Sequence, residues 1–161
     1  TQRRTLLDAH MRDLGIMLVE RDQWAEADSV WKESADNYLK YKGRSSMDYL
    51  NSASFYALSA AMRGRNAEAE RLLRTVLASD LAKRPEPNPI ADRARLFLGR
   101  VLLDEGRITE AEPLLLGAIG SKGRTLSRAS YRLAIRSLVE LYLTDGRPTD
   151  AARYAAASGR P

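Results

Sequence analysis

The 161-residue chain has 26 Lys and Arg against 21 Asp and Glu, a formal net charge of +5, and 44% of its residues are hydrophobic. This length suffices for a domain with a buried core, and the abundance of Ala, Leu, Arg and Glu favours helix over sheet. The chain lacks cysteine, which excludes disulfides and thiolate catalysis, and it has no apolar run long enough to span a membrane. We expect a cytoplasmic protein and, because the chain begins at Thr1, a fragment of a longer one.

The positive charge is unevenly distributed. Residues 1–80 carry 12 basic and 12 acidic side chains, whereas residues 81–161 carry 14 basic and 9 acidic ones. The whole net charge therefore lies in the second half. Such asymmetry favours a local anionic partner over a uniformly basic protein.

Four alanines recur at a nearly constant spacing of 42, 42 and 40 residues: Ala27, Ala69, Ala111 and Ala151. Five residues before each of these anchor alanines lies a turn residue: Asp22, Gly64, Gly106 and Gly146. Glycine is expected where a helix ends in a left-handed residue. The pattern therefore predicts an all-α fold of about eight helices, arranged as four stacked helix-turn-helix hairpins.

In chain order, we expect the four hairpins at about residues 4–42, 46–82, 89–122 and 125–158, within one domain that spans 1–161. Trp24 and Trp31, seven residues apart on one helix face, are expected in the core. Ser45 or Ser46 is the expected N-cap of the second hairpin. Three prolines within residues 83–89 exclude helix there and predict a connector between repeats.

One hairpin, residues 99–119, has a small residue at each position where its helices must approach: Gly99, Gly106, Ala111 and Ala118. This pattern resembles the tetratricopeptide repeat family, whose standard unit is about 34 residues. The longer unit, with residues 110–115, is similar to the kinesin light chain subtype. Residues 138–154 are similar to the closing segment of repeat arrays attached to bacterial serine/threonine kinases. Two positions depart from the family pattern: Asp22 at the first turn, and Arg95 where a bulky apolar residue is usual.

The resemblance implies a non-catalytic protein–protein interaction scaffold, the docking or sensor arm of a bacterial signalling protein. It also implies that the hairpins stack into a right-handed α-solenoid, in which the first helix of each hairpin lines a concave groove for a partner segment. By register, the groove positions are Arg12, Ile16, Asn51, Ser54, Leu58, Arg93, Leu96, Arg100, Arg132, Leu133, Arg136 and Glu140. Ile16, Leu58, Leu96 and Leu133 would supply apolar contacts, and the arginines would select acidic character. No catalytic residue, cofactor or metal is expected, because the single histidine, His10, has no companion ligands.

A run of arginines recurs at every fourth residue: Arg124, Arg128, Arg132 and Arg136, here called the arginine stripe. No acidic residue occurs between Glu112 and Glu140 to neutralise it. The stripe is either a surface that binds carboxylates or phosphates of a peptide, or a solvated helix face.

We expect a protein or peptide partner of acidic character. Nucleic-acid binding through the basic second half is the alternative, although aromatic residues are sparse along the arginine stripe, whereas such binding usually uses several. A further alternative is self-assembly as a homodimer through the repeat ends.

Overall fold

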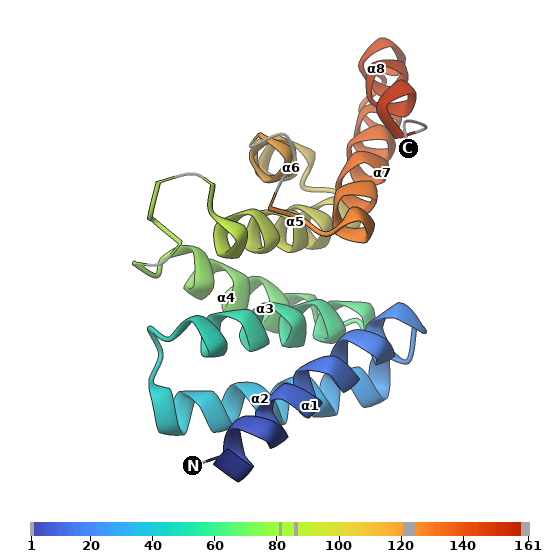
Figure 1. The fold of residues 1–161 in the computed structure, drawn as a ribbon. Helices are drawn as coiled ribbons and strands as arrows, with labels where there is room; N and C mark the ends of the chain where they lie inside the picture. The colour runs from blue at the N-terminus through green and yellow to red at the C-terminus, as the bar shows by residue number, and fades with distance from the viewer. Residues whose placement is uncertain (1, 81, 86, 121–124, 159–161) are drawn as a thin grey trace. The chain divides into compact units, whose positions relative to one another are not determined.

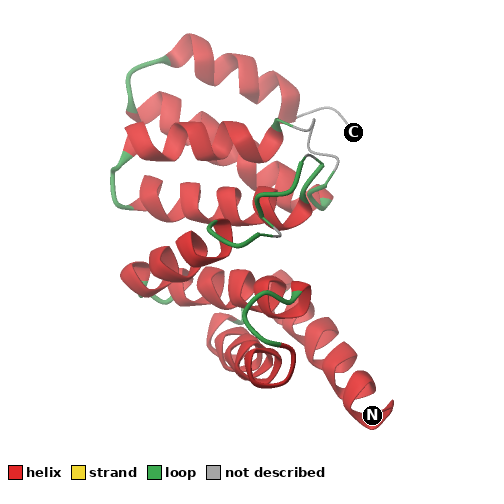
Figure 2. Ribbon diagram, turned by 90° about the vertical axis from the view of Figure 1, so that its left-hand side faces the viewer, coloured by secondary structure: helices red, strands yellow, loops and turns green. Residues whose placement is uncertain are grey.

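The computed structural model describes residues 2–80, 82–85, 87–120 and 125–158. In these residues there are eight helices and no strand (Figure 2). Their bounds are α1 (Gln2–Glu20), α2 (Trp24–Lys42), α3 (Met47–Met62), α4 (Asn66–Leu77), α5 (Pro89–Asp104), α6 (Ile108–Ile119), α7 (Arg128–Thr144) and α8 (Pro148–Ser158). Consecutive helices pair into four hairpins (Figure 1), so the predicted all-α fold of helical hairpins is confirmed.

The chain forms two compact units, residues 1–81 and 82–161. In the first unit α2 packs against α1 and α3, and α4 packs against α3; in the second, α5, α6 and α7 pack together and α8 packs against α7. The division falls beside the predicted proline-rich connector, after which Asn88 caps α5 by accepting a hydrogen bond from the Ala91 N–H at 3.1 Å. The single repeat domain expected from the sequence stays a prediction.

Each hairpin turns at a residue with left-handed backbone. The φ angles are 57° at Asp22, 78° at Gly64, 74° at Gly106 and 70° at Gly146. At the third turn, the Gly106 N–H donates to the Leu103 carbonyl and the Arg107 N–H donates to the Leu102 carbonyl, both at 2.9 Å. The same two bonds close the other three turns, satisfying carbonyls that the helix end would leave free. Asp is among the few residues besides glycine that tolerate this backbone, which explains the first turn.

The anchor alanines lie where the two helices of each hairpin approach most closely. Ala27, Ala69 and Ala111 are 0% exposed and Ala151 is 3% exposed. On the facing helix, a Cβ at Gly99 would lie 2.8 Å from Leu115 Cγ, and a Cβ at Gly15 would lie 2.5 Å from Trp31 Cε2. Both distances are too short for a real contact, so the close approach requires these glycines.

The two tryptophans occupy different environments. Trp31 is fully buried and stacks on Phe55 of α3, with ring centroids 4.6 Å apart. Trp24 is only half-buried, because it begins α2 directly beside the turn. The core prediction is therefore right for Trp31 and wrong for Trp24. Ser46 is the N-cap of α3, accepting from the Tyr49 N–H at 3.2 Å, as expected.

An acid that is buried in one unit and half-buried in the other recurs where the second hairpin of each unit meets the first. Asp28 of α2 accepts from Arg63 Nη1 at 2.9 Å and also pairs with Arg65. In the second unit, Arg147 Nη1 donates to both carboxylate oxygens of Glu112 at 3.0 Å. Both acids directly follow an anchor alanine, and Arg65 and Arg147 each precede one by four residues. The same charge-assisted contact thus joins the two hairpins in each unit.

Substitutions at two of the turns should change the free energy of unfolding in opposite directions. Gly106→Ala should lower the free energy of unfolding by about 1–2 kcal/mol, because alanine is strained at positive φ. Asp22→Gly should raise it by up to about 1 kcal/mol, because glycine relieves the strain present there. Urea denaturation of both variants measures these changes, and a stabilised Gly106→Ala variant would contradict the role of the turn.

Alanine substitutions at two glycines of the same hairpin distinguish the effect of close packing from that of helix propensity. Gly99→Ala should lower the free energy of unfolding by about 1–3 kcal/mol, because the new Cβ overlaps Leu115. Gly117→Ala is the matched control, because its Cβ would meet only the flexible stem of Arg95, at 3.2 Å. Its free energy of unfolding should stay unchanged or rise by up to about 1 kcal/mol. Thermal and chemical denaturation measure both variants. An equal loss of stability in Gly99→Ala and Gly117→Ala would contradict the close contact at Gly99.

Candidate functional site

The first unit holds five of the predicted groove positions: Arg12, Ile16, Asn51, Ser54 and Leu58. On α1, Arg12 and Ile16 are exposed. On α3, Ser54 and Leu58 are buried, at 1% and 7% exposed, and Asn51 is half-buried. The Ser54 hydroxyl donates to a backbone carbonyl of its own helix at 2.8 Å. In this unit the exposed predicted positions are therefore those on α1.

The second unit holds the other seven: Arg93, Leu96, Arg100, Arg132, Leu133, Arg136 and Glu140. Leu96 is 0% exposed, and Leu133 is half-buried. Arg93 is also half-buried, and burial lowers the pKa of its guanidinium below the ordinary value. The exposed members of this set, Arg132, Arg136 and Glu140, all lie on α7.

An ion-pair network ties α5 to α7. Arg100 of α5 pairs with Asp104 one turn further along its own helix, with Nε 3.2 Å from Oδ2, and with Glu140 of α7. Burial works to lower the pKa of the Arg100 guanidinium, but the hydrogen bonds to Glu140 and Asp104 raise it overall. The charges of Arg100 and Glu140 are therefore neutralised by ion pairs within the unit.

The described part of the arginine stripe is uncompensated. Arg124 lies outside the described residues. Arg128, Arg132 and Arg136 are exposed on consecutive turns of α7. Within the parts of the chain that the structure describes, none of the three makes an ion pair or a side-chain hydrogen bond. They leave three guanidinium groups available on one helix face.

This arrangement costs α7 local stability. Arg128 opens the helix, and the first turn carries no acidic residue, so positive charge meets the positive end of the helix dipole. Like charges four residues apart also repel one another. By contrast, α4 and α6 carry Glu68 and Glu110 in their first turns. Local rules are most often broken at functional sites, which favours a binding role for α7.

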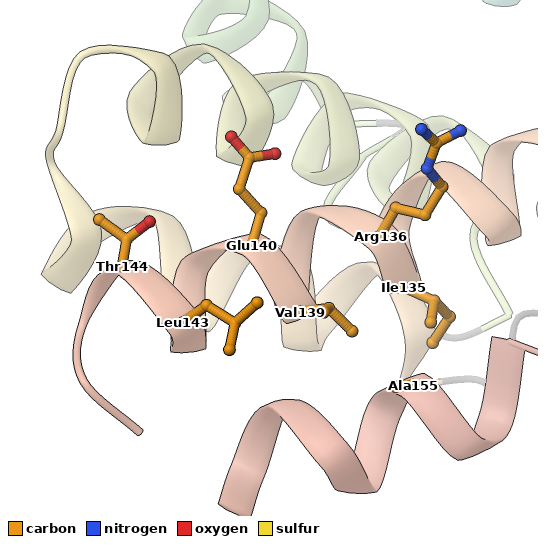
Figure 3. A pocket seen from close by; sticks show the side chains of 7 residues that line it. All are labelled: Ile135, Arg136, Val139, Glu140, Leu143, Thr144 and Ala155. Atoms are coloured by element: carbon orange, nitrogen blue, oxygen red, sulfur yellow. The ribbon is translucent and has the colours of Figure 1, made fainter. Parts of the chain in front are cut away.

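A concave site of about 440 Å³, here called the α7 pocket, adjoins the stripe. It is lined by Ile135, Arg136, Val139, Glu140, Leu143 and Thr144 of α7 and by Ala155 of α8. Figure 3 shows the three apolar α7 side chains on the side of α7 where Ala155 lies, and Arg136 and Glu140 on the other side. Leu143 is 60% exposed, so the site offers an unburied apolar side chain, and the unpaired Arg136 belongs to the same lining.

The groove positions predicted from the sequence include neither Val139 nor Leu143. The structure leaves Val139 half-buried and Leu143 exposed in the α7 pocket. The signal was present, since Ile135, Val139 and Leu143 form an apolar row beside the buried row that contains Leu138. A helix apolar on two adjacent faces has more apolar surface than one neighbour covers.

Arg95, the departure from the repeat pattern, has a structural role. Its Nη1 donates to Asp92 at 3.0 Å, and the buried Asp92 carboxylate also accepts from the Thr125 hydroxyl. A Cβ at Gly117 would lie 3.2 Å from Arg95 Cδ, so the arginine stem packs where an apolar residue is usual. The head group meanwhile compensates a buried charge.

His10 is exposed, and the described residues contain no group of three side chains able to hold a metal ion. Nor does any described helix combine the length and the hydropathy needed to cross a membrane.

Residues 57–127 match the tetratricopeptide repeat family. The match covers less than half of the chain and supports the resemblance to that family. Tetratricopeptide repeats generally mediate protein–protein interaction and are typically non-catalytic scaffolds. A search of curated proteins found no match to the chain.

Reversing the charge at the start of α7 should stabilise the protein. Arg128→Glu should raise the free energy of unfolding by about 0.5–1 kcal/mol, because an acid there favours the helix dipole and removes one repulsion. Arg153→Glu, at an exposed position within α8, should change it by less than about 0.5 kcal/mol. Urea denaturation at low salt measures both, and a less stable Arg128→Glu variant would show that the arginine is compensated.

Proposed function

We propose that the chain binds an acidic segment of a partner protein on α7, with Arg132 and Arg136 meeting carboxylates and the α7 pocket receiving an apolar side chain. The observation that carries the proposal is the arginine stripe, exposed and uncompensated among the described residues. Guanidinium groups form two parallel hydrogen bonds with a carboxylate, and such charge-assisted bonds are stronger than neutral ones.

The apolar part of the site would add affinity without charge. Burying the exposed Leu143 side chain under a partner residue contributes roughly 1.5–2 kcal/mol. A cavity of about 440 Å³ accommodates one or two side chains rather than a folded surface. The site is therefore suited to a short segment that inserts an anchor residue.

The spacing along α7 constrains the partner sequence. Arg132 and Leu143 are eleven residues apart, which corresponds to about 16 Å along a helix. An extended peptide covers that length in about five residues. A partner segment should therefore carry its acidic residue and its apolar anchor about five positions apart if extended, or about eleven apart if helical.

The finer expectations remain part of the proposal. A docking or sensor role in a bacterial signalling protein is supported only by the similarity of residues 138–154 to kinase-linked repeat arrays. The kinesin light chain-like subtype, the cytoplasmic location and the homodimer through repeat ends also stay predictions. The predicted groove positions on α1, α3 and α5 also stay predictions.

Peptide libraries test the proposal. Immobilised peptides with acidic and apolar residues at these spacings should bind the chain, and neutral versions should bind at least about tenfold more weakly. The double variant Arg132→Glu, Arg136→Glu should lose binding by at least about tenfold, and binding should weaken with added salt. Biolayer interferometry gives these affinities.

Arg153→Glu is the matched control, because it changes an exposed arginine on α8 outside the α7 pocket. It should retain binding of the acidic peptides. Equal losses of binding in this control and in the double variant would show that binding depends only on net charge. Random oligonucleotides test the alternative ligand class: if they bind with sub-micromolar, strongly salt-dependent affinity that the double variant loses, the partner is nucleic acid and not an acidic peptide.

A further inference from the structure

In the first unit, a cavity of about 260 Å³ lies among α2, α3, α4 and the connector between α2 and α3. Its polar lining includes Lys32, Asp36, Arg44, Tyr49, Glu68 and Arg71. None of the predicted groove positions lines it. The cavity is therefore a site that neither the sequence prediction nor the proposed function accounts for.

The two carboxylates that line this cavity already have partners. Asp36 Oδ2 lies 2.7 Å from Lys32 Nζ, and this hydrogen bond raises the pKa of Lys32, which keeps the pair charged at neutral pH. Glu68 accepts from the Tyr56 hydroxyl at 2.6 Å and from Arg65 at 2.8 Å. Negative charge in the lining is thus compensated.

The remaining donors of the cavity have no such partners. Arg44 and Arg71 are exposed, and among the described residues they make no ion pair or side-chain hydrogen bond. Tyr49 is only 6% exposed, yet its hydroxyl has no hydrogen-bond partner in the described chain. The buried polar side-chain atoms without a partner in the described chain are Trp31 Nε1 and Ser137 Oγ, so the Tyr49 hydroxyl is solvent-accessible and can donate to a ligand in the cavity.

We propose that this cavity binds a single oxyanion group, a carboxylate or a phosphate on a peptide side chain, held by Arg44, Arg71 and Tyr49. These three donors have no acceptor in the described chain, and an oxyanion would supply both acceptors and negative charge. Its volume is smaller than that of pockets for drug-sized ligands, which suits one small group. Because all its residues lie in the first unit, the site is independent of the α7 surface.

Titration of the whole, isotope-labelled chain with inorganic phosphate at constant ionic strength tests the site by NMR. Signals of residues that line the cavity should shift and saturate. Peptides that differ only in carrying phosphoserine, aspartate or serine at one position then identify the source of the oxyanion. The two anionic peptides should bind and the serine peptide should not, with the tighter anion showing which group the cavity prefers.

Variants separate the site from general electrostatics. The double variant Arg44→Gln, Arg71→Gln should weaken the tighter anionic peptide by at least about tenfold, and Tyr49→Phe by about threefold. Arg21→Gln, an exposed arginine of the same unit outside the cavity, should leave binding unchanged, as should the α7 double variant. Absence of saturable shifts, or equal weakening by Arg21→Gln, would overturn the proposal.

Discussion

The left-handed backbone at the hairpin turns is the constraint on which the rest of the structure depends. It lets two hydrogen bonds close the end of the first helix and sends the chain back against that helix. The anchor alanine five residues later then lies at the closest approach, where a larger side chain would push the helices apart. Turn and alanine therefore act as one unit, and their repetition sets the register of all four hairpins.

Charged side chains serve two purposes in this framework. Asp28 and Glu112 receive arginines from the following hairpin, and Arg100 joins α5 to α7 through Glu140. Each of these pairs neutralises a charge within its own unit. Arg132 and Arg136 stand apart, because the described chain gives them no acid and their own helix would be more stable without them. The structure thus distinguishes arginines that assemble the units from arginines left for a partner.

The two candidate sites lie in separate units, and both contain unpaired arginines. On α7, unpaired arginines adjoin an exposed apolar pocket, which suits a segment with both acidic and apolar residues. Among α2, α3 and α4, unpaired arginines and a tyrosine hydroxyl line one cavity, which suits a small oxyanion. Each site would therefore favour negative charge but differ in what accompanies it. Separate variants can address them, because they share no residue.

The sequence by itself determined the four hairpins, since local backbone strain at Gly106 and its counterparts, and small size at the anchor alanines, are properties of residue type and spacing. It also identified the arginine stripe, because a four-residue spacing fixes a helix face. Only the tertiary structure decided which charges are compensated: Arg100 and Glu140 are forty residues apart and meet only because α5 packs on α7. It likewise decided that Leu96 is buried whereas Leu143 is exposed, because burial depends on which faces find a neighbouring helix.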